Sequence, residues 1–414
     1  MSQLHAMRLI KEIARRTLAR RTFSAPSKIP PRAYHATAGL PNGDSGAGCL
    51  SKDGGSWNRE ESKHGEFKFI LDMSPWSAKR EARILSLSDP ADGANDALHK
   101  GKLPYSSRLL GIGTDVSAFG GLEEQKPNVL FVSPSCPQAS RQLPLVLEAF
   151  PSIEWVHCRS AGIDFVVSNE LSEVPADRML MTNAKGQFSS SLAEYCMMAM
   201  SYFAKDLPRL LRQKGEKNWE KYDVQELRGR TLGVVGYGDI GRATARLAHA
   251  YGMRVVALRR CPDLSRGDPL CDEVYGTSQE SLCQLMSESD YVVCSAPLTP
   301  DTHGMVGSDA FRAAREGQVF INLGRGPVVD EAALVEALGA GGSLRGAALD
   351  VFSEEPLPRD HALWELDNVL LSPHNMDQTA TFMHEATEFF VHENLPRYIC
   401  GRDLLNPVDA RLGY

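Results

Sequence analysis

The stretch from residue 228 to residue 260 constrains the fold of this chain more than any other. The apolar run Thr231–Val235 is typical of a buried parallel strand, and a glycine-rich turn follows it. The apolar pattern over Ala243–Tyr251 predicts a helix, and Met253–Leu258 predicts a second strand. A strand, a glycine turn, a helix and a strand in this order predict a βαβ unit of the kind that binds a dinucleotide.

The turn has the spacing G-x-G-x-x-G, in which each glycine has its own physical role. We expect Gly236 to permit the sharp turn, Gly238 to let the backbone approach a pyrophosphate, and Gly241 to let helix and strand pack closely. The phosphates would lie at the helix N-terminus, where free N–H groups and the helix dipole favour an anion. Asp239 and Ile240, inside the motif, are further candidates for cofactor binding.

Length and composition set the broad class. With 414 residues the chain can form two or three domains, each with its own core. No apolar run approaches the roughly 20 residues needed to cross a bilayer, so we expect no membrane partner. The nine cysteines are odd in number and form no C-x-x-C motif. This argues against a disulfide framework, favours a reducing compartment and predicts no metal site.

The formal charge of −7 is divided unevenly, with +7 in residues 1–40 and −14 in the rest. The first twenty residues separate an apolar face from an arginine-rich face on a helical wheel, which resembles a mitochondrial transit peptide. We therefore predict the mitochondrial matrix, with a plastid or a cytoplasmic protein as the alternatives. Residues 38–66 are rich in glycine, serine and charge and predict a linker, so residues 1–66 would lie outside the folded domains.

On both sides of the glycine turn, predicted strands alternate with predicted helices, which indicates α/β architecture. The region 98–124 has no clear period, and no element is predicted there. The other predicted strands are Phe67–Leu71, Ile84–Leu87, Asn128–Ser133, Ile153–Cys158, Met179–Thr182, Tyr291–Cys294, Val319–Leu323, Gly346–Leu349 and Val369–Leu371. The other predicted helices are Leu143–Phe150, Ser189–Phe203 and Glu331–Leu338.

Four successive predicted strands beyond the glycine turn end in motifs that contain polar residues, glycine or proline. In a doubly wound sheet, ligands bind outside the carboxyl ends of the strands. We therefore expect the side chains that follow these strands to gather at one edge, beside the glycine turn. They are Arg325, Asp350, Glu355 and His374.

These motifs together resemble the D-isomer-specific 2-hydroxyacid dehydrogenases, the family of D-3-phosphoglycerate dehydrogenase and glyoxylate/hydroxypyruvate reductase. The resemblance rests on the segments GVVGYGDIG, PLTPDT, NLGRGPVVDEAAL, ALDVFSEEPLP and VLLSPH. It implies a Rossmann-type doubly wound parallel sheet and a second, flavodoxin-like α/β substrate domain that is discontinuous in sequence. The implied substrate domain comprises residues 67–204 and 373–414, and the implied NAD(P)-binding domain comprises residues 205–372.

Hydride addition to a ketone needs a proton donor at the developing alkoxide and a cation for the substrate carboxylate. His374 suits the donor because an imidazole exchanges protons near neutral pH. Glu355 matches the family's position for the carboxylate that orients the imidazole, and the adjacent Glu354 is the competitor. Arg325 offers a fixed fork of donors that can bind a carboxylate and polarise a carbonyl.

The resemblance also assigns residues around the cofactor and the substrate. Asp350 resembles the family residue near the nicotinamide, and Pro297 and Thr302 resemble its cofactor loop. Another loop resembles the one whose backbone N–H groups hold the substrate carboxylate. It consists of Ser160, Ala161 and Gly162. We expect the nearby Asp164 to stabilise that turn.

The expected activity is reduction of a small 2-oxo acid, such as glyoxylate or hydroxypyruvate, to its D-2-hydroxy acid, or the reverse. The segment Asn375–Gln378 departs from the small apolar stretch of many relatives and leaves the substrate open. D-3-phosphoglycerate dehydrogenase is one alternative, although the short segment after His374 disfavours its long, regulated type. A dinucleotide-sensing interaction protein like the corepressors that share this fold is the other.

The end of the second strand predicts the cofactor preference. In NAD sites of this kind an acidic residue about 20 positions beyond the glycines bonds the ribose hydroxyls. Here that position holds Arg259, followed by Arg260. A guanidinium can pair with a 2′-phosphate that a carboxylate would repel, so we expect NADP(H) to be preferred and NAD(H) to be possible. The expected partners are the acid substrate and, from the family, a second copy of the chain, with no nucleic acid.

Overall fold

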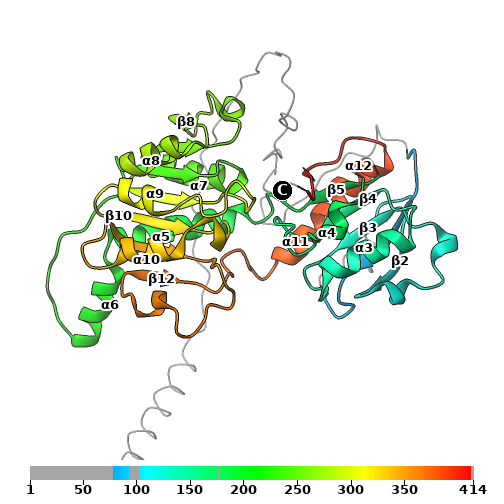
Figure 1. Ribbon diagram of the computed structural model, residues 1–414, viewed down its shortest axis with the longest axis horizontal. Coiled ribbons are helices and arrows are strands. Elements are labelled where there is room, and N and C mark those ends of the chain that lie inside the picture. Colours follow the sequence, from blue (N-terminus) through cyan, green and yellow to red (C-terminus); the bar gives the residue numbers. More distant parts are fainter. Residues whose placement is uncertain (1–77, 94–97, 99–102, 176–177, 412–414) are drawn as a thin grey trace, which may run out of the picture. The chain divides into compact units, whose positions relative to one another are not determined.

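The computed structural model describes residues 78–93, 98, 103–175 and 178–411, which belong to the compact unit Leu50–Tyr414. They form two parallel sheets, each with helices packed against it (Figure 1). The predicted transit peptide and linker, residues 1–66, and the predicted strand Phe67–Leu71 lie outside the described residues. In the part that is described, no helix is long and apolar enough to cross a membrane.

The first sheet has the strand order β13-β5-β4-β3-β1-β2 and is parallel except for the pair of β13 and β5. Its central strands are apolar runs that are buried on both faces, as parallel strands require. The strands are β1 (Ala82–Leu87), β2 (Ser107–Gly113), β3 (Val129–Val132), β4 (Trp155–Cys158), β5 (Leu180–Asn183) and β13 (Pro407–Val408). The helices that follow β3 and β4 are α3 (Ala139–Ala149) and α4 (Asn169–Ser172).

Strand β2 lies within the region where no element is predicted. It is an edge strand, and most of its side chains are only partly buried. Its register against β1 shifts between Ile84 and Leu85. Because of this partial burial, β2 shows neither the continuous apolar run nor the strict alternation by which strands are found in sequence.

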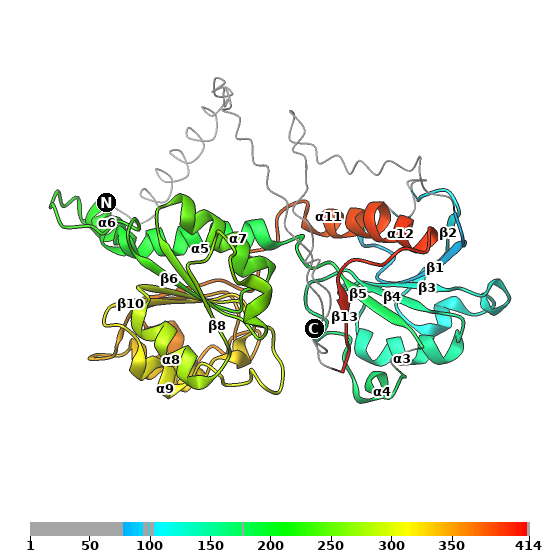
Figure 2. The same ribbon diagram turned by 90° about the horizontal axis from the view of Figure 1, so that it is seen from above.

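The C-terminal segment returns to the first sheet, as expected for a discontinuous domain. Its helices run along one face of that sheet (Figure 2), and β13 pairs with β5. Phe390 packs on Trp155 with ring centroids 5.3 Å apart, which places this segment in the core of the sheet. The helical elements are α11 (Phe382–Phe389), the π-helix η7 (Phe390–Asn394) and α12 (Leu395–Ile399).

The second sheet is parallel throughout and has the order β12-β11-β10-β9-β6-β7-β8. The strand order reverses between β6 and β9, so the carboxyl ends of these two strands form the switch point at which such sheets bind ligands. The strands are β6 (Thr231–Val235), β7 (Arg254–Leu258), β8 (Glu273–Tyr275), β9 (Tyr291–Cys294), β10 (Gln318–Asn322), β11 (Leu344–Leu349) and β12 (Val369–Leu371).

Helices cover both faces of the second sheet. They are α5 (Ser189–Ala204), α7 (Asp239–Ala250), α8 (Gln279–Glu288), α9 (Ser308–Ala313) and α10 (Glu331–Leu338). Helix α6 (Leu207–Glu216) follows α5 and is largely exposed. Short 3₁₀ helices lie in the connections between these elements: η2 (Val116–Phe119), η3 (Glu123–Gln125), η4 (Pro262–Ser265), η5 (Gly326–Val328) and η6 (Ala362–Glu365).

Helix α5 differs from the expected domain division. The sequence places it in the substrate domain, whereas the structure packs it against α7, with Met200 and Phe203 in the same core as Leu232 and Val255 of the second sheet. An apolar helix can cover either sheet, and only the tertiary packing decides which one. The boundary between the two packing units therefore lies near Phe188, ahead of α5, and not at residue 204.

Most of the described cysteines lie in the cores. Seven of them are free, and five of these are buried: Cys136, Cys158, Cys196, Cys294 and Cys400. Cys261, which follows the two arginines after β7, is disulfide-bonded. One bonded cysteine beside seven free ones is not the disulfide framework that the sequence argues against.

Candidate active site

The glycine turn lies at the switch point of the second sheet. Gly236 has a φ of +96°, and a Cβ there would lie 2.7 Å from the backbone N of Ala296. A Cβ on Gly241 would lie 2.6 Å from the carbonyl oxygen of Gly236, so this glycine allows α7 to pack closely on β6. Gly238 instead faces open space. The turn therefore has the shape that the sequence predicts, with room for a pyrophosphate at Gly238.

Helix α7 begins at Asp239, four residues before the predicted start, so its N-terminus lies directly at the turn. The carboxylate of Asp239 lies 3.4 Å from the ammonium group of Lys185. A free carboxylate would repel a pyrophosphate, and Lys185 offsets that charge. Asp239 would therefore contact the phosphates through its backbone N–H group. The same holds for Ile240, because its side chain packs against the core of the sheet.

The loop after β9 brings Pro297 and Thr302 together. The hydroxyl of Thr302 donates a hydrogen bond of 2.6 Å to the carbonyl oxygen of Pro297 and accepts one of 2.8 Å from the backbone N of Thr299. These bonds close the loop beside the glycine turn, since Ala296 contacts Gly236. The two residues thus lie where the resemblance places the cofactor loop.

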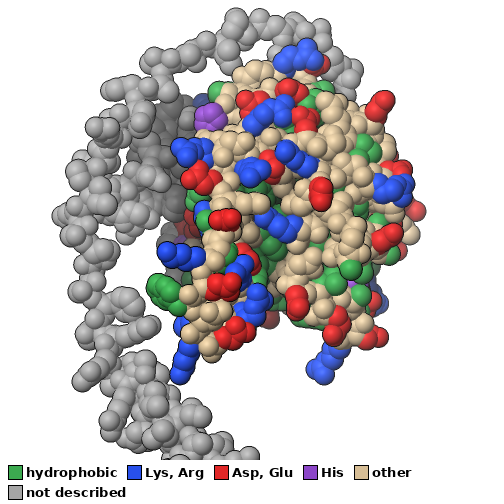
Figure 3. Space-filling model, turned by 90° about the vertical axis from the view of Figure 1, so that its left-hand side faces the viewer, with side chains coloured by type: hydrophobic (Ala, Val, Ile, Leu, Met, Phe, Trp, Pro, Cys, Tyr) green, Lys and Arg blue, Asp and Glu red, His purple; other side chains and the backbone are tan. Residues whose placement is uncertain are grey.

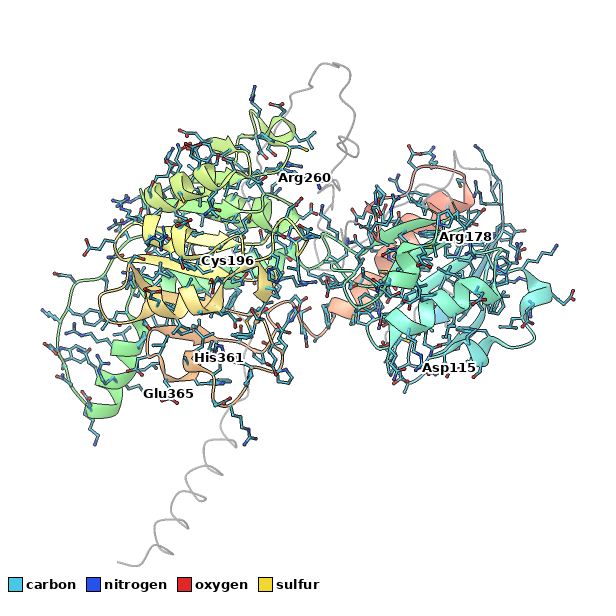
Figure 4. The ribbon with its side chains drawn as sticks, in the orientation of Figure 1. Asp115, Arg178, Cys196, Arg260, His361 and Glu365 are labelled. Atoms are coloured by element: carbon cyan, nitrogen blue, oxygen red, sulfur yellow. The ribbon has the colours of Figure 1, made fainter. Side chains whose placement is uncertain are left out.

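Arg259 lies at the end of β7 and is partly buried. Its guanidinium donates to the hydroxyl of Ser265 in η4, and in the described part of the chain it forms no ion pair. Burial lowers the pKa of Arg259, and the neighbouring Arg242 lowers it further. Asp239 and Asp268 raise this pKa, but the net shift is downward. Arg242 is paired with Asp268 at 2.8 Å, whereas Arg259 has no carboxylate partner in the described residues, so its guanidinium is in a favourable position for an anion. Arg260, which follows Arg259 and is labelled in Figure 4, is exposed to solvent.

His374 and Glu355 form a hydrogen-bonded pair. Nδ1 of His374 lies 2.8 Å from one carboxylate oxygen of Glu355, and the other oxygen accepts a hydrogen bond of 2.9 Å from the backbone N of Phe352. The carboxylate is thereby held in place, and it leaves Nε2 of His374 available to a ligand. The side chain of His374 is 42% exposed, so a substrate can reach it. The structure places Glu355 at the histidine, and not its competitor Glu354.

Asp350 holds the turn that follows His374. Its carboxylate is buried and accepts hydrogen bonds from the hydroxyl of Ser372 at 2.7 Å and from the backbone N atoms of Asn375 at 3.1 Å and Met376 at 3.4 Å. Burial raises the pKa of Asp350, and these hydrogen bonds oppose that rise. The predicted nicotinamide residue therefore also fixes the backbone on which His374 is mounted.

The loop of Ser160, Ala161 and Gly162 follows the buried strand β4. The hydroxyl of Ser160 donates to the carbonyl oxygen of Gly162 at 2.6 Å, and the side chain of Asn183 donates to the carbonyl oxygen of Ala161 at 2.5 Å. Within the described residues, the backbone N–H groups of these three residues have no acceptor. Three adjacent free donors are suited to a carboxylate.

Arg325 meets this loop. A Cβ on Gly162 would lie 1.7 Å from Nη2 of Arg325, so a side chain at this position would displace the guanidinium from where it lies. Nε and Nη2 of Arg325 donate to one carboxylate oxygen of Asp164 at 3.1 and 2.9 Å. The prediction for Asp164 is therefore incomplete, because this carboxylate also holds the predicted catalytic arginine. A long-range ion pair of this kind has no signal in a single sequence.

The arrangement combines a histidine–carboxylate pair, an arginine and a set of free backbone donors with a dinucleotide turn. The three residues Arg325, Glu355 and His374 follow β10, β11 and β12, and this common origin explains why they could be predicted from the ends of strands. Three further residues contribute through their contacts and are not predicted: Asn183, Lys185 and Ser265. Asn183 and Lys185 contact partners that are distant in sequence, and no motif indicates the contact of Ser265 with Arg259. In the described residues, no group of His, Cys, Asp and Glu could hold a metal ion.

Comparison with known proteins identifies relatives of this chain. Residues 197–375 match the family model of the D-isomer specific 2-hydroxyacid dehydrogenase, NAD binding domain. A glyoxylate reductase of Korarchaeum cryptofilum is 34% identical over 238 residues, which cover 55% of this chain and 68% of the relative. A D-3-phosphoglycerate dehydrogenase of Archaeoglobus fulgidus is 32% identical over 231 residues, which cover 55% of this chain but only 42% of the relative.

A solved structure is similar over both sheets. It is the NADPH-dependent glyoxylate/hydroxypyruvate reductase of Sinorhizobium meliloti in complex with NADP and malonate. The two chains share 27% sequence identity and a TM-score of 0.60, over 80% of this chain and 98% of that one. The chain therefore belongs to the D-isomer-specific 2-hydroxyacid dehydrogenase family, and it is an NAD(P)-dependent oxidoreductase that acts on a CH–OH group.

Proposed function

We propose that this enzyme reduces small 2-oxo acids, such as glyoxylate and hydroxypyruvate, to D-2-hydroxy acids, with NADPH as the preferred reductant. The observation that carries the proposal is the pair of His374 and Glu355 at 2.8 Å, at the strand ends beside the dinucleotide turn. The similarity to glyoxylate reductases supports the substrate class. NAD(P)H, when bound, supplies the hydride.

The remaining groups account for the rest of the reaction. The free backbone donors of Ser160–Gly162 bind the substrate carboxylate, and Arg325 polarises the carbonyl oxygen. His374 donates the proton to that oxygen as the alkoxide develops, while Glu355 stabilises the orientation of its imidazole. Gly238 and the N-terminus of α7 would hold the pyrophosphate of the cofactor, and Pro297, Thr302 and Asp350 would contact its nicotinamide half.

The experiment is a turnover assay with a panel of 2-oxo acids and both reduced cofactors. We expect the highest kcat/KM with glyoxylate or hydroxypyruvate and NADPH. A highest kcat/KM with 3-phosphohydroxypyruvate would instead support the activity of the D-3-phosphoglycerate dehydrogenase relatives. Absence of turnover with every 2-oxo acid would contradict the proposal.

We also propose that the enzyme is a homodimer, as the family resemblance implies. Helix α6 and the connection from it to β6 expose large apolar side chains, among them Leu211 at 65% and Trp219 at 94%. On the face that Figure 3 presents, acidic and basic side chains are interspersed. A solution mass of about twice the chain mass is expected, and Trp219→Asp should shift it toward the monomer. A monomeric wild type would contradict this proposal.

The proposed location is the mitochondrial matrix, from the arginine-rich amphipathic start of the chain. A fluorescent protein that carries residues 1–60 should enter mitochondria. A matched fusion in which Arg8, Arg15 and Arg16 are replaced by glutamine should stay in the cytosol, because import requires the positive face. Plastid import of the first fusion would support the alternative compartment, and a cytosolic distribution would refute an organelle address.

A further inference from the structure

The segment that departs from the pattern of the relatives, Asn375–Gln378, forms a tight turn directly after His374. The backbone N of Gln378 donates to the carbonyl oxygen of Asn375 at 3.0 Å, and its side chain donates to the carbonyl oxygen of His374 at 2.9 Å. The hydroxyl of Ser191 donates to the carbonyl oxygen of Met376 at 2.6 Å. With the two hydrogen bonds to Asp350, this turn is fixed on both sides of residue 377.

The side chain of Asp377 is partly buried in this turn. Within the described part of the chain, its carboxylate forms no hydrogen bond or ion pair with another residue. Burial raises the pKa of Asp377; His374 and Arg325 lower it, and Asp350 raises it. The carboxylate is thus an unpaired acceptor that interacts electrostatically with His374 and Arg325.

The proposed function assigns binding partners to two parts of a 2-oxo acid. The loop Ser160–Gly162 binds its carboxylate, and Arg325 and His374 contact its C2 carbonyl. The group that extends beyond C2 is left without an assigned partner. Asp377 follows His374 by three residues, in the turn that the side chain of Gln378 ties to the carbonyl oxygen of His374. Its partly buried, unpaired carboxylate is therefore the candidate to meet that group.

We propose that Asp377 is a specificity-determining residue that selects 2-oxo acids in which the group attached to C2 is uncharged and can donate a hydrogen bond, such as hydroxymethyl, and rejects those with a second anion. A hydroxyl would donate to the free carboxylate, whereas a phosphate or a second carboxylate would meet a like charge in a partly desolvated site. Specificity of this kind uses repulsion of the wrong ligand as well as attraction of the right one. This inference rests on the proposed function and narrows its substrate class.

The test compares kcat/KM for hydroxypyruvate and for 3-phosphohydroxypyruvate, at saturating NADPH and low ionic strength. The two substrates differ in the phosphate alone. For the wild type we expect hydroxypyruvate to be favoured by at least about tenfold. Asp377→Asn should reduce this ratio by about tenfold, mainly by raising kcat/KM for the phosphate substrate. Asp360→Asn is the matched control, because it removes one exposed negative charge from outside the site and should leave the ratio unchanged.

Two results would overturn the inference while the proposed function stands. One is a wild type that reduces hydroxypyruvate but favours the phosphate substrate or treats both alike. The other is an unchanged ratio in Asp377→Asn. If Asp360→Asn changed the ratio of kcat/KM by the same factor, the net charge of the protein would determine the ratio. That result would also overturn the inference. Absence of turnover with both substrates in the wild type would contradict the proposed function itself.

Discussion

Replacing His374 by alanine is expected to lower kcat by about 10²- to 10⁴-fold, the usual contribution of a positioned general acid. The imidazole is oriented by Glu355 at 2.8 Å, and its 42% exposure leaves the other nitrogen open to the substrate. The affinity for NADPH should change little, because His374 follows β12 and the dinucleotide turn follows β6. Steady-state kinetics with hydroxypyruvate and a fluorescence titration of NADPH measure the two effects.

The neighbouring glutamates provide the control for this prediction. Glu355→Gln should lower kcat, because the imidazole of His374 gives up a proton and regains one in each cycle. A neutral amide stabilises the protonated imidazole less than a carboxylate does. Glu354→Gln should leave kcat unchanged, since Glu354 is exposed and lies outside the pair. If Glu354→Gln lowered kcat and Glu355→Gln did not, the pairing in solution would differ from that in the structure.

Replacing Arg259 by aspartate is expected to reverse the cofactor preference. A charge-assisted hydrogen bond to a 2′-phosphate contributes on the order of 1.5–3 kcal/mol, so the wild type should favour NADPH over NADH by roughly ten- to hundredfold in kcat/KM. The aspartate would repel that phosphate and could instead accept hydrogen bonds from the ribose hydroxyls of NADH. The measurement is kcat/KM for both cofactors at one saturating 2-oxo acid.

A second charge reversal tests whether the effect is local. Arg266 is also cationic and lies in the same segment, but its side chain is 81% exposed and paired with Asp263. Arg266→Asp should leave the cofactor ratio within about twofold of the wild type, because an exposed charge is screened by solvent. Equal use of NADPH and NADH by the wild type, or an equal shift in both variants, would show that Arg259 does not recognise the phosphate.

Much of the second sheet could be predicted from the sequence. The predicted bounds of Thr231–Val235, Glu331–Leu338 and Val369–Leu371 agree with those of β6, α10 and β12. Strand β6 is an almost fully buried apolar run, and α10 buries one apolar face that includes Leu334 and Leu338, so both show the local patterns by which elements are predicted. The grouping of Arg325, Glu355 and His374 could be predicted for a related reason, since parallel strands bring their carboxyl ends to one edge.

Other features depend on contacts that no local pattern reports. The partly buried edge strand β2 shows no clear period, and the apolar helix α5 fits either sheet until its packing on α7 is known. The ion pair of Arg325 with Asp164 joins residues 161 positions apart. Whether the carboxylate of Asp377 has a partner likewise depends on the folded turn and not on the local sequence. Long-range pairing therefore limits what can be predicted of the site more than residue type does.

The central claim is that the site transfers a hydride from NADPH to C2 of a 2-oxo acid and forms the D product. Incubation of the enzyme with hydroxypyruvate and NADPH deuterated at C4 of the nicotinamide, separately at each of its two faces, tests this claim directly. We expect one of the two labelled cofactors to deliver deuterium to C2, and chiral analysis to identify the product as D-glycerate. Glycerate without label from either cofactor, or the L enantiomer, would contradict the account.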